Sequence, residues 1–123
     1  MRIYVSHASS YDYATNLYEP LRAAFAANHD LILPHDTDSQ GANSRDIIPT
    51  CDVVFAEVSY PSTGQGIELG WADAAGVPII CFYRTDEKPS GSLRFVTDNT
   101  LAYSAPDDMV DKLQSRFVDY LAL

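Results

Sequence analysis

Apolar runs alternate along the chain with segments in which apolar residues recur at helical spacing. The runs predict five short strands, at Arg2–Ser6, Asp30–Pro34, Cys51–Val58, Pro78–Tyr83 and Thr100–Tyr103. The third run, CDVVFAEV, is nearly continuous and rich in β-branched residues. Such a run is typical of a parallel strand that is covered on both faces.

The segments between these runs predict helices. Pro20 lies inside the first segment and predicts a kink or a late helix start. Gly76 and Pro78 are expected to close the third segment. The polar stretches 35–43 and 84–92 are expected to be loops. The expected helical segments are Tyr13–Asn28, Ser44–Pro49, Gly66–Ala75 and Pro106–Leu121.

The alternation of strand and helix predicts right-handed βαβ units around an open parallel sheet. We therefore expect an α/β fold of the flavodoxin-like kind: a three-layer sandwich whose five-stranded parallel sheet has the order 2-1-3-4-5. The length fits a single domain over residues 1–123. In this order a crevice opens at the carboxyl ends of strands one and three. The loops Ser6–Asp12 and Ser59–Gln65 should flank a ligand there.

The charge of the chain narrows the choice of partners. The formal net charge is -9, and an acidic surface repels phosphate backbones and anionic lipids. We therefore expect neither a nucleic-acid polymer nor a membrane as a partner, although one local site can still hold a small phosphorylated ligand. A membrane span and a signal-peptide pattern are both missing from the sequence, which favours a cytoplasmic location.

Metal and cofactor signals are weak in this sequence. Cys51 and Cys81 lie far apart, inside or beside apolar runs, and are expected to be buried free thiols. The three histidines form no metal-like spacing with a pair of acids. We predict no metal and no cofactor.

The stretch SYPSTGQGIELG holds the most distinctive chemistry. Gly64 and Gly66 allow a tight turn and a close ligand approach, and Glu68 follows where a helix is expected to begin. Unpaired amides at a helix start can bind an anion and also stabilise an acid in the first turn. A carboxylate beside a sugar can attack its anomeric carbon. An acid in a first turn can equally serve the helix alone.

The segment DVVFAEVSYPSTGQGIELGWADAAGVPIICFYR, Asp52–Arg84, resembles the nucleoside 2-deoxyribosyltransferase family. Within that family it is most similar to the 2'-deoxynucleoside 5'-phosphate N-hydrolase branch. The family motif Pro-Ser-x-Gly-x-Gly-x-Glu-x-Gly is matched without a gap by PSTGQGIELG, Pro61–Gly70. The N-terminal segment Ile3–Arg22 looks like the family's first strand, ligand loop and first helix.

The resemblance implies an enzyme of nucleotide metabolism that cleaves an N-glycosidic bond. It acts as a hydrolase or as a transferase that passes the deoxyribosyl group to another base. Glu68 would be the nucleophile of this glycosidase chemistry, and the substrate would be a nucleoside or its 5'-monophosphate. The family also implies a homodimer or a higher homo-oligomer. The residues implied to bind the substrate are Ser6, His7, Ser9, Ser10, Ser62, Gly64 and Gly66.

The chain departs from the family at one sugar-binding position. The family has an Asp eight residues before the Asp that opens the third strand, and the residue here is Ser44. Asp46 lies two positions later, and we take it as the second catalytic residue. Asp36 and Asp38 in the preceding loop are the alternatives. The first loop also lacks the glycine and arginine that are frequent in the hydrolase branch.

Several other residues have two interpretations each. His7 and His35 either assist the leaving base by proton transfer or are plain loop residues. Glu57 either lines the site or pairs with a partner elsewhere, and Trp71 either packs in a core or dimer contact or stacks on a base. Asp52 is expected to be structural. The tyrosines considered as candidates for covering a base are Tyr11, Tyr13, Tyr60 and Tyr83.

Two other functions remain open from the sequence. The segment IYVSHASSYDY also looks like the first strand and loop of Toll/interleukin-receptor domains, which implies a signalling module or an NAD-cleaving one. The other alternative is a nucleotide-binding module without turnover. Release of free base from nucleosides, nucleotides or NAD separates the three.

Overall fold

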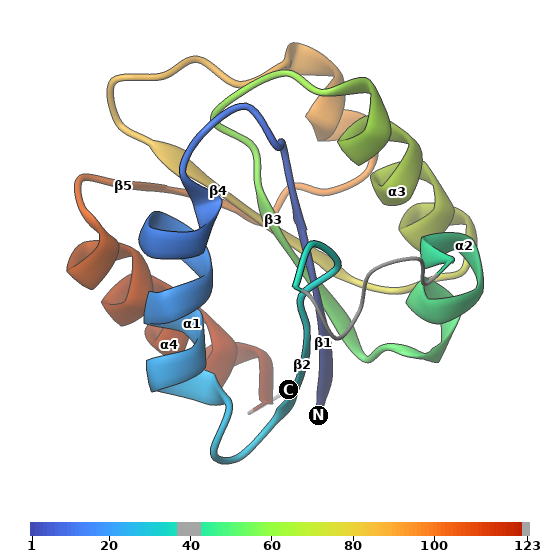
Figure 1. Cartoon of the computed structure of the whole chain (residues 1–123). Helices are drawn as coiled ribbons and strands as arrows, with labels where there is room; N and C mark the ends of the chain where they lie inside the picture. The colour runs from blue at the N-terminus through green and yellow to red at the C-terminus, as the bar shows by residue number, and fades with distance from the viewer. Residues whose placement is uncertain (37–42, 122–123) are drawn as a thin grey trace.

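The sheet has the predicted architecture. The computed structural model describes residues 1–36 and 43–121. All strand pairs are parallel, and the order is β2-β1-β3-β4-β5, so the flavodoxin-like order 2-1-3-4-5 is confirmed (Figure 1). The strands are β1 (Arg2–His7), β2 (Asp30–Ile32), β3 (Val53–Glu57), β4 (Ile79–Arg84) and β5 (Thr100–Tyr103).

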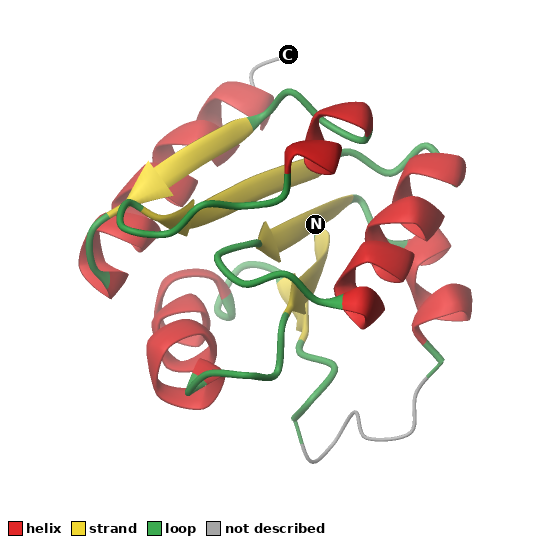
Figure 2. Cartoon of the chain, turned by 90° about the horizontal axis from the view of Figure 1, so that it is seen from above, coloured by secondary structure: helices red, strands yellow, loops and turns green. Residues whose placement is uncertain are grey.

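The helices form a layer on each face of this sheet. Helices α1 (Glu19–Phe25) and α4 (Pro106–Leu121) cover one face, and α2 (Ser44–Ile47) and α3 (Thr63–Ala74) cover the other (Figures 1 and 2). Short 3-10 turns, η3 (Ile48–Thr50) and η4 (Gly91–Phe95), join some of these elements. A π-helical turn, η1 (Ala14–Tyr18), comes directly before α1.

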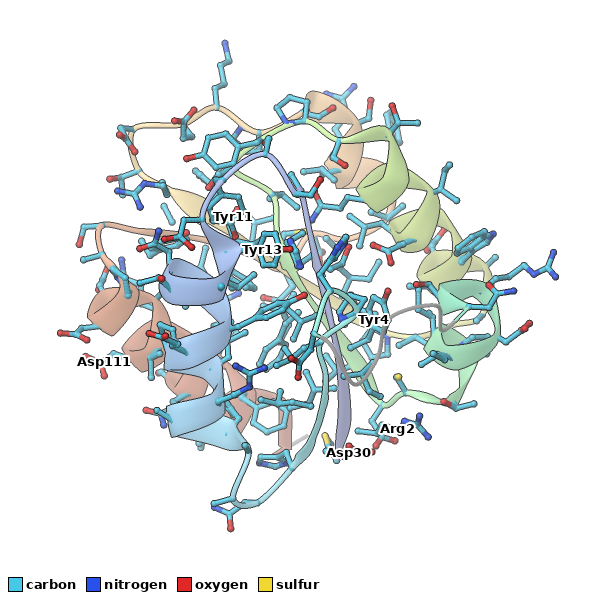
Figure 3. The ribbon with its side chains drawn as sticks, in the orientation of Figure 1. Arg2, Tyr4, Tyr11, Tyr13, Asp30 and Asp111 are labelled. Atoms are coloured by element: carbon cyan, nitrogen blue, oxygen red, sulfur yellow. The ribbon has the colours of Figure 1, made fainter. Side chains whose placement is uncertain are left out.

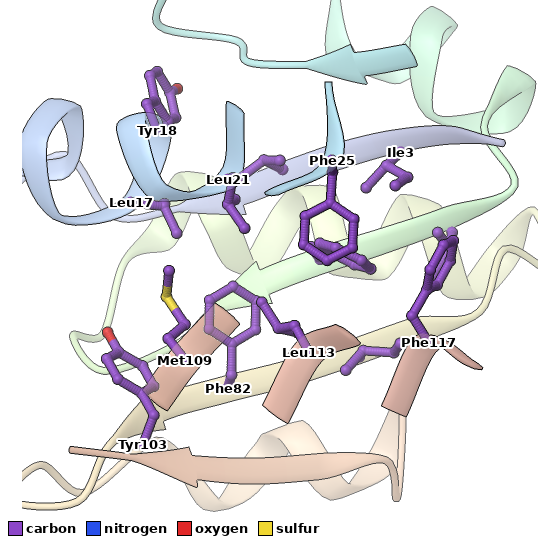
Figure 4. Close-up of a cluster of buried hydrophobic side chains, with 14 of the residues drawn as sticks. Ile3, Leu17, Tyr18, Leu21, Phe25, Phe82, Tyr103, Met109, Leu113 and Phe117 are labelled. Atoms are coloured by element: carbon purple, nitrogen blue, oxygen red, sulfur yellow. The ribbon is translucent and has the colours of Figure 1, made fainter. Parts of the chain in front are cut away.

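The period-two alternation of the strands builds two cores. One lies under α1 and α4, where Phe82 from the sheet shares a cluster with Phe25 and Phe117 (Figure 4). Phe55 of the middle strand packs edge-on against Phe25 and Phe117. The other lies under α3 and contains Tyr4, Val54, Ala56 and Cys81. Because alternate residues of a strand share a face, Tyr4 and Ser6 of β1 both point to the side of α3.

One helix start agrees with the late start predicted from Pro20, and one differs from the sequence prediction. Pro20 lies in the first turn of α1, directly after the π-helical turn, because its missing N–H is tolerated there. The predicted start of the third helix at Gly66 is wrong, because α3 begins at Thr63. The Oγ of Ser62 caps this helix by accepting a hydrogen bond from the Gln65 amide at 3.3 Å. Glu68 therefore lies in the second turn, and its expected place in the first turn is corrected.

Candidate active site

Glu68 points from the second turn of α3 toward β1, and both of its carboxylate oxygens accept a hydrogen bond. The Ser6 hydroxyl donates to Oε1 at 3.0 Å, and the Tyr4 hydroxyl donates to Oε2. Figure 3 shows Tyr4 on the side of β1 that faces α2 and α3. The carboxylate is thus held by two side chains of one strand and not by the amides at the start of α3.

Tyr4 also links Glu68 to Ser44. The Tyr4 and Ser44 hydroxyl oxygens lie 2.6 Å apart. Since the single proton of Tyr4 is donated to Glu68, the Ser44 hydroxyl is the donor in this pair. Burial, and then the bond to Glu68, raise the pKa of Tyr4 far above its ordinary value, so this hydroxyl stays a donor at any working pH. Sequence reasoning missed Tyr4, although strand alternation places it on the same face as Ser6.

We expect Tyr4→Phe to lower the turnover of the N-glycosidic cleavage predicted from the sequence by about 10- to 100-fold, because one of the two donors to Glu68 is lost. The side-chain volume is nearly unchanged, so the thermal midpoint should shift little. The measurement is kcat by chromatography of released base. Ser92→Ala, at an exposed position in η4, is the control. A rate equal to that of the wild type would show that the bond does not matter for catalysis.

Glu68 lines a pocket of about 460 Å³. This volume is within the usual range for small-ligand sites. Its walls come from loops at the carboxyl ends of β1, β2 and β3, as the fold predicts, together with the start of α2 and the first turns of α3. The lining residues are His7, Ser9, His35, Asn43, Ser44, Ser62, Gly64, Gln65, Ile67, Glu68 and Trp71.

The structure brings most of the predicted site residues to this pocket. His7, Ser9, Ser62 and Gly64 line it together with Glu68, and buried Ser6 reaches it through its bond to Glu68. Ser10 is exposed in the same loop, outside the lining, and Gly66 faces a different hollow. None of the four tyrosines considered for base contact is in the lining, whereas Trp71 is.

The acids proposed for the second catalytic role are placed elsewhere. The Asp46 side chain is 72% exposed, lies 3.9 Å from Arg45 Nε and does not line the pocket, whereas Ser44 does. Asp46 follows Ser44 by two positions, which turns it far around the helix axis. Asp36 pairs with Arg22 at 2.8 Å. Asp38 lies outside the described residues, so its role stays a prediction.

His7 is held in one tautomer at the floor of the pocket. Its Nδ1 lies 2.7 Å from the Ala8 carbonyl, which can only accept, so Nδ1 carries the proton. Its Nε2 then accepts from the Tyr18 hydroxyl at 2.6 Å. Burial is the main cause that lowers the pKa of His7, to about 4. The ring is therefore neutral near pH 7, and its one N–H proton is donated to the Ala8 carbonyl and not to a leaving base.

The lowered pKa of His7 predicts a loss of stability in mild acid. The unfolded chain binds a proton at this residue below about pH 6.5, whereas the folded chain does so only near pH 4, so stability falls between these values. Wild type should lose up to about 3 kcal/mol more than His7→Gln over this window. Urea unfolding from pH 7 to pH 4 measures the difference, and parallel curves for the two proteins would contradict it.

Glu57 belongs to the opposite face of the sheet. Its carboxyl group accepts from the Ser59 amide at 2.6 Å, from the Ser59 hydroxyl at 2.9 Å and from the Tyr103 hydroxyl. Burial raises its pKa above the ordinary value. This buried network shapes the turn after β3, and Glu57 does not line the Glu68 pocket. Asp52 is structural as well, since it accepts from the Arg2 amide at 2.7 Å at the far end of β1.

A second hollow of about 480 Å³ lies on the other flank of α3, against η4. Its walls include Val58, Leu69, Leu93 and Val96, and it holds no carboxylate or imidazole among the described residues. This chemistry suits packing and not bond cleavage, so the candidate active site is the Glu68 pocket. The described residues contain no group of three potential metal ligands. They also contain no helix with the length and hydropathy of a membrane span.

Fold and pocket together define a class: a flavodoxin-like α/β protein with a hydrogen-bonded glutamate at the carboxyl edge of a parallel sheet. No protein-family model matches the chain. A protein of Thermofilum pendens that is named as a 2'-deoxynucleoside 5'-phosphate N-hydrolase is 37% identical over 74 residues, covering 56% of this chain and 52% of the relative. The chain thus spans about half the length of this relative.

Two solved structures share the fold. The CMP N-glycosidase of Clostridium botulinum has a TM-score of 0.70 at 21% identity, covering 93% of this chain and 99% of that one. The 2-deoxyribosyltransferase of Bacillus psychrosaccharolyticus has a TM-score of 0.60 at 19% identity, covering 89% and 90%. The sequence matches confirm the resemblance to the nucleoside 2-deoxyribosyltransferase family that Pro61–Gly70 predicted. The two solved structures show that the fold is shared.

Proposed function

We propose that this protein cleaves the N-glycosidic bond of a nucleoside or a nucleoside 5'-monophosphate, with Glu68 as the nucleophile. The observation that carries the proposal is the Glu68 carboxylate, which is fixed by Tyr4 and Ser6 at the wall of a pocket of about 460 Å³. The similarity to proteins named as N-hydrolases favours this chemistry over a Toll/interleukin-receptor-like function.

The reaction takes two steps. In the first, a Glu68 oxygen bonds to C1' as the C1'–N bond breaks and its electron pair leaves with the base. In the second, water or another base attacks C1', and the bond between C1' and Glu68 breaks to restore the carboxylate. Attack by water makes the protein a hydrolase, and attack by a second base makes it a transferase.

The other pocket residues are assigned to substrate binding. Ser9, Ser62 and the amide of Gly64 offer donors to the 5' end of the substrate, and Trp71 offers an aromatic face to the base. The start of α3 adds a partial positive charge beside Ser62 and Gly64. Asp46 is given no step, since its side chain is exposed and outside the lining. The homo-oligomer and the cytoplasmic location stay predictions.

The test is to incubate the protein with a panel of substrates and to measure free base by chromatography. The panel contains deoxynucleosides, ribonucleosides, their 5'-monophosphates and NAD, each with and without a second base. Release of base from a nucleoside or nucleotide supports the proposal. Release of nicotinamide alone would favour the NAD-cleaving alternative, and binding without release from any compound would favour a module without turnover.

A further inference from the structure

A proton donor for the leaving base is the part that the Glu68 pocket still needs. A departing nucleobase takes the electron pair of the C1'–N bond, and protonation by a positioned acid accelerates such a departure. Glu68 is the one carboxylate among the described residues that line the pocket. Where the family resemblance expects an Asp, Ser44 supplies a hydroxyl that is already bonded to Tyr4.

Two imidazoles line the pocket, and they differ in availability. His7 is buried, and both of its ring nitrogens have partners. His35 is exposed at the rim, and within the part of the chain that the structure describes its ring nitrogens make no hydrogen bond or ion pair. An imidazole with an available ring nitrogen can donate a proton to a ligand and later accept one.

The backbone and ring contacts of His35 fix it at this rim. Its backbone N–H donates to the Tyr18 hydroxyl at 3.0 Å, the same hydroxyl that donates to His7. Its ring lies against two others, with centroids 5.0 Å from His7 and 5.4 Å from Tyr13. The ring therefore packs against two other rings and also lines the pocket.

We infer that His35 is the general acid that protonates the leaving base, an assignment that rests on the proposed function of Glu68. As Glu68 bonds to C1' and the C1'–N bond breaks, the His35 imidazolium transfers one proton to the base. The neutral imidazole then accepts a proton from the water that attacks C1', while the bond to Glu68 breaks and its electron pair returns to the carboxylate. The sum is one water consumed and one free base and one free sugar released.

The test compares two leaving groups on the same sugar. One substrate is the nucleoside or nucleotide that the wild type cleaves best. The other is the 4-nitrophenyl glycoside of the same sugar, whose leaving group, 4-nitrophenolate, departs without a proton. Only the first turnover is measured, before water attacks the glycosyl ester. His35→Gln should release the natural base about 100-fold more slowly than wild type. It should release 4-nitrophenolate within about threefold of the wild-type rate.

Three controls separate the possible outcomes. His29→Gln, at the histidine that contacts the N-terminus at 3.2 Å, should match wild type on both substrates. Glu68→Gln should be inactive on both. Equal losses with both leaving groups in His35→Gln, or no loss with either, would overturn the role of His35 and leave that of Glu68 standing. A wild-type protein that is inactive on both substrates would overturn the proposed function and this role with it.

Discussion

Glu68→Gln should reduce the release of base by about 1000-fold or more, because an amide cannot form the bond to C1' that the carboxylate forms. Glutamine has nearly the same shape. Its Oε1 still accepts from one of the two hydroxyls, and its Nε2 donates to the other, which then has to turn its own proton away. The loss should appear in kcat at saturating substrate. Chromatography of released base under single-turnover and steady-state conditions measures it.

The matched control for this variant is Glu19→Gln, which changes an exposed acid in the first turn of α1. It should keep wild-type activity. Intact-mass spectrometry of acid-quenched reactions should show a glycosyl adduct on wild type and Glu19→Gln but not on Glu68→Gln. A Glu68→Gln protein that keeps more than about a tenth of the activity would exclude Glu68 as the nucleophile.

Phe55→Ala should destabilise the fold by about 4 kcal/mol. Phe55 is fully buried in the middle strand, with ring centroids 5.4 Å from Phe25 of α1 and 5.8 Å from Phe117 of α4. Truncation removes the ring that both helices pack against and leaves a cavity that the rigid sheet cannot fill. Urea unfolding followed by circular dichroism gives the free energy of unfolding.

Val118→Ala serves as the control for the core substitution. Val118 is 63% exposed on α4, so its truncation should change the free energy of unfolding by less than about 0.5 kcal/mol. A loss below about 1 kcal/mol in Phe55→Ala would mean that α1 and α4 close over the vacated space, contrary to the tight packing of this core.

The fold could be predicted from the sequence because its pattern is consistent at every level. The near-continuous apolar runs are typical of parallel strands. The predicted bounds of α4, Pro106–Leu121, are those of the helix in the structure. The start of α3 could not be predicted, since Gly64 and Gly66 have poor helix propensity. The capping Ser62 and the packing of Leu69 against the sheet outweigh that cost.

Only part of the candidate site could be predicted from the sequence. Motif resemblance singled out Glu68, and topology placed it in the crevice. Tyr4 was not predicted, because a tyrosine inside an apolar run is normally a core residue. Its hydrogen bonds also depend on two segments far away in the sequence. The exposure of Asp46 depends on how the short α2 helix sits on its neighbours. Spacing within one segment cannot encode that orientation.

The twin donors on Glu68 have a thermodynamic consequence. Both carboxylate oxygens of Glu68 accept from hydroxyls of one strand, which restricts rotation about the last bonds of the Glu68 side chain. The Glu68 side chain therefore loses its conformational entropy once, when the chain folds. It does not lose this entropy again when a substrate binds. In the proposed mechanism, Glu68 is therefore already held in one rotamer before the substrate binds.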